Sequence, residues 1–167
     1  MTHTSQQGFT LVETLVAIFI LVMSITGPLF IAQQSFTSAA TARDRTVASF
    51  LAQEGVEYIR SVRDHNFLSG NSDWLDGLSF CISSDCTIDA SVSSYPSIAS
   101  CVGTCEVLRK TTTGLYGYRN GVTTLFMRRI SITQVQSHEI SVEVQVSWEY
   151  KGTTRSVTVE ERLFNWL

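Results

Sequence analysis

The N-terminal part of the chain contains one long, uninterrupted run of apolar residues. The run covers residues 9–32, FTLVETLVAIFILVMSITGPLFIA, and Glu13 is its only ionisable residue. As a helix, its 24 residues would extend about 36 Å, which is more than the ~30 Å hydrocarbon core of a membrane. The sequence therefore predicts a single membrane-spanning helix with the rest of the chain on one side.

The helical pattern continues to about Asp64, but there it is apolar on one side only. Its apolar positions recur at spacings of four and seven, with two more beside them: Val47, Leu51, Tyr58, Val62, Phe50 and Ile59. A stripe of this kind is typical of a helix that packs against one partner. Gly55 lies on the same stripe, where we expect it to permit close approach of that partner.

The last 45 residues alternate between apolar and polar positions. The clearest alternation places these apolar residues on one side: Ile140, Val142, Val144, Val146, Trp148 and Tyr150. Shorter alternations cover 126–132 and 156–160, and Gly152 lies in the last link. The pattern predicts an antiparallel meander over residues 123–167. The expected fold class is α+β, a long N-terminal helix packed on a three- to four-stranded antiparallel sheet.

The segment between helix and meander, residues 66–122, has no clear periodicity. It is rich in glycine, serine, asparagine and threonine, and we expect short strands at 86–90 and 105–110 with loops elsewhere. Such a weakly packed connection would gain most from cross-links.

All four cysteines of the chain lie in this segment, at Cys81, Cys86, Cys101 and Cys105. An even number of cysteines in an exported head favours disulfides. Two local pairs are sterically possible, and so is a Cys86–Cys101 bridge nested inside Cys81–Cys105. The alternative of a zinc site is less favoured, because the spacings are wider than the tight C-x2-C knuckle.

Composition argues against several classes of function. The net charge of the 167 residues is −3, so we do not expect nucleic acid as a partner. His65 and His138 are far apart and have no nucleophile at a recognised spacing. The loop acids Asp73, Asp76, Asp85 and Asp89 do not have the spacing of a calcium loop. We therefore expect neither an enzyme nor a cofactor or metal site.

The first eight residues, MTHTSQQG, precede the apolar run and end at Gly8. In a secretory signal the small residue at the cleavage site follows the apolar stretch, and here that order is reversed. Residues 8–22, GFTLVETLVAIFILV, closely resemble the prepilin signature of type IV pilins and type II secretion pseudopilins. The resemblance implies that a prepilin peptidase cuts between Gly8 and Phe9 and that Phe9 is N-methylated. The leader lacks the Lys and Arg residues that leaders of this family usually carry.

Glu13 would be the fifth residue of the processed chain. A carboxylate within an apolar helix is costly unless it is paired, and such residues are functional by default. Glu13 could merely lie at the headgroup level, where the helix dipole favours an acid. The prediction that we favour is an assembly role, in which Glu13 pairs with the Phe9 amine of the next subunit, or its own, and sets the register.

The resemblance extends beyond the signal. The segment LAQEGVEYIRSVRDHNF at 51–67 and the ending VSWEYKGTTRSVTVEERLFNW are similar to PilV-type minor pilins and GspI-type pseudopilins. This implies a cleaved leader (1–8), a transmembrane and filament-assembly helix (9–32) and an exported head (33–167). The implied function is that of a minor pilin or pseudopilin. The alternative is a pilus-tip binding module, an adhesin or DNA-uptake receptor, on the same scaffold.

The implied partners are a prepilin peptidase, other pilins or pseudopilins, and an inner-membrane assembly platform. The implied location is a single pass of the inner membrane with the head outside the cytoplasm. After assembly the subunit would lie in a cell-surface pilus or a periplasmic pseudopilus.

Overall fold

The computed structural model describes residues 8, 10–92, 95–101 and 103–165. The chain divides into two compact units, Met1–Arg43 and Asp44–Leu167. Helix α1 (Leu11–Leu68) includes residues of both units and continues through Pro28. It ends about one turn beyond Asp64, the end expected from the sequence.

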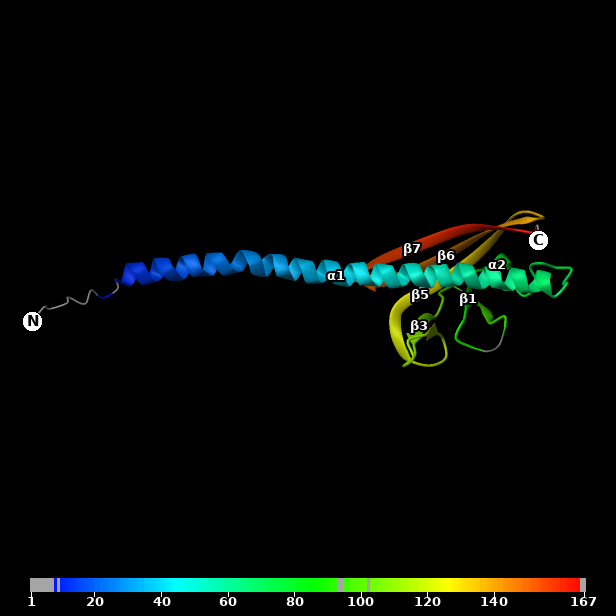
Figure 1. Cartoon of the computed structure of the whole chain (residues 1–167), viewed down its shortest axis with the longest axis horizontal. Coiled ribbons are helices and arrows are strands. Elements are labelled where there is room, and N and C mark those ends of the chain that lie inside the picture. The colour runs from blue at the N-terminus through cyan, green and yellow to red at the C-terminus, as the bar shows by residue number, and fades with distance from the viewer. Residues whose placement is uncertain (1–7, 9, 93–94, 102, 166–167) are drawn as a thin grey trace, which may run out of the picture. The chain divides into compact units, whose positions relative to one another are not determined.

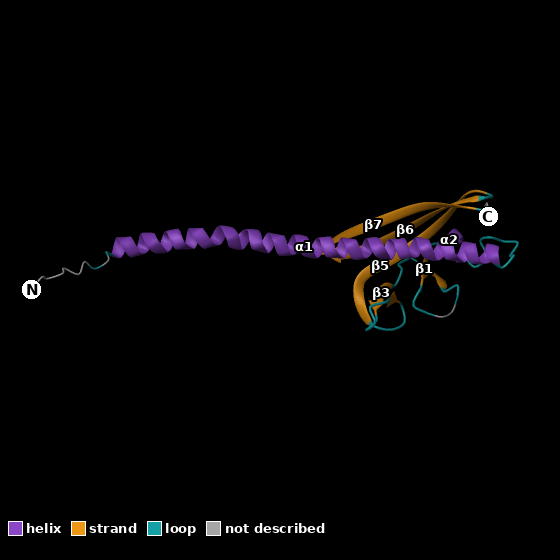
Figure 2. Ribbon diagram, in the orientation of Figure 1, coloured by secondary structure: helices purple, strands orange, loops and turns teal. Residues whose placement is uncertain are grey.

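The second unit contains the remaining elements (Figures 1 and 2). They are α2 (Ser79–Ser83), β1 (Cys86–Ile88), β2 (Ile98–Ser100), β3 (Val107–Lys110), β4 (Tyr116–Gly117), β5 (Val122–Gln136), β6 (Glu139–Tyr150) and β7 (Thr153–Phe164). The two strands expected between helix and meander are confirmed as β1 and β3. The sequence pattern does not predict α2, β2 or β4.

The strands form one antiparallel sheet, and the meander β5–β6–β7 is confirmed. The expectation of three to four strands is wrong, because the sheet has seven. Strand β5 is 15 residues long, so its edge away from β6 accommodates both β1 and β3. Strands β2 and β4 extend the sheet further. Strands β1–β4 contain only two to four residues each, too few to produce a readable alternation.

The β6–β7 hairpin shows how a local sequence sets the register. Tyr150 pairs with Thr153, so the connecting loop contains only Lys151 and Gly152. Both loop residues have positive φ, 51° and 74°, as a two-residue type I′ turn requires. The glycine adopts this conformation without steric cost.

The core of the second unit lies between α1 and the sheet. In Figure 1, the C-terminal part of α1, within the second unit, lies alongside β5, β6 and β7. The inward side chains of β6 are buried from Ile140 to Trp148, which confirms the alternation. A Cβ atom at Gly55 would lie 2.8 Å from Cγ1 of Val144, so the expected close approach is confirmed. Phe50 departs from the expected stripe, because 67% of it is exposed.

Candidate functional site

The first turn of α1 carries Glu13, the residue that the sequence links to assembly. Thr10 precedes the helix, and its Oγ1 accepts a hydrogen bond from the backbone N–H of Glu13 at 3.3 Å. A threonine followed three residues later by glutamate is a capping-box pattern, a start signal readable in the sequence alone. The side chain of Glu13 is exposed and lies where the positive end of the helix dipole favours an acid. Gly8 is exposed, and Phe9 lies outside the described residues.

The apolar stretch of α1 has no protein surface over it in the described residues. Every residue from 10 to 40 is exposed. By length and composition, α1 can cross a membrane. The hydroxyls of Ser24 and Thr26 donate to the carbonyls of Ile20 and Val22, four residues earlier. Polar side chains satisfied by their own helix are tolerated in an apolar environment.

A comparison with protein families identifies this segment. Residues 3–27 match the family model of the prokaryotic N-terminal methylation motif. This is the type IV prepilin-like signal, and it indicates a type IV pilin-like substrate of a prepilin peptidase. The signal implies processing by that peptidase and assembly with other pilins, and the apolar helix is of the kind that anchors prepilins in a membrane. No curated protein and no solved structure matches the chain.

The four cysteines form two local disulfides in the structure, Cys81–Cys86 and Cys101–Cys105. Their Cα atoms are 4.9 Å apart in each pair. The first links α2 to the start of β1, and the second follows the end of β2. Each therefore braces a short element, α2 with five residues and β2 with three.

Arg128 on β5 is the most buried charged residue among those described. Its side chain is 0% exposed and lies between α1 and β1. The guanidinium donates to the Leu51 carbonyl at 3.1 Å and the Glu54 carboxylate at 2.6 Å, both on α1. Its other terminal nitrogen donates to the Ile88 carbonyl of β1 at 2.9 Å. The signal in the sequence is that Arg128 occupies an inward position between Phe126 and Ile130, where a charge needs a partner.

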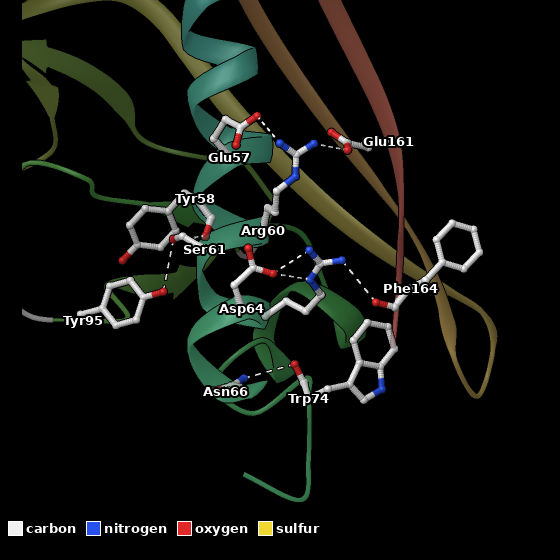
Figure 3. A network of polar contacts seen from close by, with 11 residues as sticks. Glu57, Tyr58, Arg60, Ser61, Asp64, Asn66, Trp74, Tyr95, Glu161 and Phe164 are labelled. Atoms are coloured by element: carbon white, nitrogen blue, oxygen red, sulfur yellow. Dashed lines mark hydrogen bonds and ion pairs between the residues drawn. The ribbon is translucent and has the colours of Figure 1, made fainter. Parts of the chain in front are cut away.

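A second set of polar contacts joins the last turns of α1 to β7 (Figure 3). Arg60 bridges Glu57, at 2.6 Å, and Glu161 of β7. The hydrogen bond to Glu161 raises the pKa of the Arg60 guanidinium, so it stays charged. One turn later, Arg63 donates to the carbonyl of Phe164 at 3.2 Å. The final turns of α1 are therefore held to the last strand by directional contacts.

The opposite side of α1 holds the loop before β2. The hydroxyl of Tyr58 accepts a 2.6 Å hydrogen bond from the backbone N–H of Ser97. Burial raises the pKa of Tyr58, and this hydrogen bond partly offsets the shift. The Tyr95 hydroxyl lies 3.2 Å from Ser61 Oγ, and the Tyr95 ring packs against Tyr58 (Figure 3). The His65 ring also packs against Tyr95, with 5.3 Å between the ring centroids. The exposed His65 thus contacts another aromatic ring at the surface.

Proposed function

We propose that the chain is a minor pilin or pseudopilin, a structural or priming subunit of a type IV pilus or a type II secretion-like filament. The observation that carries this proposal is the prepilin-like signal at residues 3–27, which leads into an apolar helix exposed from 10 to 40. Apolar surface left in water costs about 25 cal/mol per Å². Such a helix therefore needs a membrane first and a bundle of similar helices afterwards, which is a structural role instead of a catalytic one.

In this proposal, residues 1–8 are removed by cleavage between Gly8 and Phe9, and the new Phe9 amine is methylated. Residues 9–32 anchor the subunit in the inner membrane, and residues 33–167 form the exported head. The assembly platform of the inner membrane then transfers the subunit into the filament. The disulfides of the head support this location, because disulfides persist in oxidising compartments.

Glu13 is the residue that we propose to set the register of assembly. The first turn holds it next to the Thr10 cap, and in the sequence it follows Phe9, where cleavage creates the new amine, by four positions. An ion pair with the Phe9 amine of the next subunit would offset the free-energy cost of placing the Glu13 carboxylate in apolar surroundings. A single polar pair in an apolar helix bundle favours one axial alignment over the others.

Mass spectrometry of sheared filaments under non-reducing conditions tests the central proposal. The expected result is filament-borne protein that begins at methylated Phe9 and contains Cys81–Cys86 and Cys101–Cys105. Filament-borne protein that retains residues 1–8 would contradict it.

The assembly role of Glu13 is tested by Glu13→Gln, which keeps the shape and removes the charge. We expect normal cleavage and reduced incorporation into filaments. Glu143→Gln is the matched control, because Glu143 is an exposed acid on the solvent face of β6. Equal incorporation of both variants would rule out the role of Glu13.

A second function, a pilus-tip binding module (adhesin or DNA-uptake receptor), is favoured by a cavity within residues 87–119. Replacing the segment 66–122 with that of another pilin separates the two functions. Loss of adhesion or DNA uptake with normal filament numbers would support the module. Unchanged binding would contradict it.

A further inference from the structure

The segment between α2 and β5 contains a cavity of ≈ 250 Å³. This volume is slightly below the ~300–1,000 Å³ of most small-molecule sites. Polar groups line it from three directions: Thr87 on β1, Ser97 before β2, and Glu106 and Arg119 on the loops that flank β3 and β4. Ile98 and Tyr118 contribute apolar wall. A small cavity with a few convergent polar groups is a typical binding site for a small polar ligand.

The buried carboxylate of Asp89 fixes the shape of this cavity. Asp89 is 7% exposed, and its two oxygens accept backbone N–H bonds from Ser91 at 3.0 Å and from Tyr118 at 3.1 Å. Its own N–H donates to the Ser97 carbonyl at 3.0 Å. A Cβ atom at Gly117 would lie 2.7 Å from Asp89 Oδ1, so only glycine lets the chain pass this close. Asp89 thus holds both Ser97 and Tyr118 in place.

The two disulfides brace the walls of the cavity. Cys86 directly precedes Thr87, and its bond to Cys81 fixes the start of β1. Cys105 directly precedes Glu106, and its bond to Cys101 ties Glu106 to the end of β2. The backbone at Thr87 and Glu106 is therefore constrained before any ligand arrives, which lowers part of the entropic cost of binding.

The charged groups at the rim are free to bind a ligand. Arg119 and Glu106 are both exposed. Within the part of the chain that the structure describes, neither side chain forms a hydrogen bond or an ion pair. The cavity thus offers one unpaired cation, one unpaired carboxylate and the hydroxyl of Ser97, whereas the hydroxyl of Thr87 donates to the Ala99 carbonyl at 3.4 Å.

We propose that this cavity binds an acidic monosaccharide. The Arg119 guanidinium can bind the sugar carboxylate through two parallel N–H···O bonds. Sugar hydroxyls donate and accept, which suits the Glu106 carboxylate and the Ser97 hydroxyl. A neutral sugar offers Arg119 no carboxylate, and a simple carboxylic acid offers Glu106 no hydroxyl donor, so neither uses both charged groups. This inference names a ligand for the second function proposed above and rests on it.

The experiment uses the full chain with its disulfides intact, in micelles of lauryldimethylamine oxide, whose headgroup contains no sugar. Saturation-transfer NMR and calorimetry measure binding of glucuronate and N-acetylneuraminate, with glucose and acetate as controls. We expect saturable binding of the acidic sugars only. Arg119→Gln should weaken binding about tenfold or more, since it removes hydrogen bonds between charged groups. Arg155→Gln, which changes an exposed arginine on β7, should leave binding unchanged.

Three results would overturn the proposal: no saturable binding of either acidic sugar, equal affinity for glucose, or equal affinity of the Arg119→Gln variant. Arg119 is exposed, and an unchanged disulfide map would verify that this variant folds. Filament numbers and cell adhesion of the same variant are counted separately. If the Arg119→Gln variant loses sugar binding but cells that carry it adhere normally, the result would support the binding site and contradict the tip function. Normal binding by protein that never enters filaments would contradict only the assembly function.

Discussion

Replacing Arg128 by methionine tests whether a buried cation holds the sheet to α1. The substitution keeps an unbranched apolar side chain but removes three hydrogen bonds, to the Leu51 carbonyl, the Glu54 carboxylate and the Ile88 carbonyl. Arg128 has no exposed surface, so water cannot replace these contacts without a change in packing. The variant should therefore lose stability and still form its secondary structure.

The three contacts contribute unequally to the expected loss. Ile88 is fully buried, and leaving its carbonyl without a partner costs about 1–3 kcal/mol. The side chain of Glu54 is 38% exposed, so its carboxylate can be hydrated and the ion pair itself adds at most about 1 kcal/mol. Burying methionine in place of a charged group offsets part of the loss. We expect a net loss of about 2 kcal/mol in the free energy of unfolding.

Urea unfolding of the full chain in micelles, followed by the fluorescence of the buried Trp74 and Trp148, measures this loss. A 2 kcal/mol change should lower the midpoint by about 1 M urea. Arg129→Met is the matched control. Arg129 is the next residue of β5, is 43% exposed and pairs with Asp85 at 3.4 Å, so we expect a loss under about 0.5 kcal/mol. Equal midpoints for the two variants would refute the role of Arg128.

Three further predictions concern the same unit. Gly55→Val should lower the free energy of unfolding, measured with urea, by about 2 kcal/mol, because its Cβ would overlap Val144. Gly27→Val is the control and should leave that free energy unchanged, because a Cβ at Gly27 meets no neighbour. Burial raises the pKa of Tyr118, so stability should fall as the pH rises above about 10, where only the unfolded tyrosine ionises. Tyr118→Phe should reduce that alkaline loss in urea melts at pH 7 and 11. Joint replacement of Cys81 and Cys86 by serine should cost about 2 kcal/mol in the same assay, since the bridge closes a short loop.

The sequence predicts those elements of the fold that are long enough to show a repeated pattern. Strands β5, β6 and β7 have 12 to 15 residues, and one face of β6 is buried along most of its length. Their alternation is therefore visible without the structure. Strands β2 and β4, with three and two residues, pair through backbone N–H and C=O groups, which nearly every residue carries whatever its side chain. Their presence depends on neighbours elsewhere in the chain, so no local pattern marks them.

The same distinction applies to the candidate sites. The signal around Gly8 and Glu13 is contiguous, and the sequence is enough to recognise it. Arg128 can be predicted to point inward, but its partner Glu54 lies 74 residues earlier, so the pair cannot be predicted. Likewise, four cysteines in one segment permit several pairings. Only the paths of α2, β1 and β2 bring Cys81 to Cys86 and Cys101 to Cys105.

Two kinds of contact fix α1 on the sheet, and they have different consequences. An apolar stripe on an apolar sheet face stabilises packing but does not set its register, since dispersion and burial are non-directional. Gly55 facing Val144 and Arg128 reaching Glu54 each require one axial position of the helix. A slip of one helical turn, about 5.4 Å, would break both contacts while much of the apolar surface stays covered. Helix and sheet can therefore be expected from the stripe alone, whereas their alignment depends on a glycine and a buried arginine.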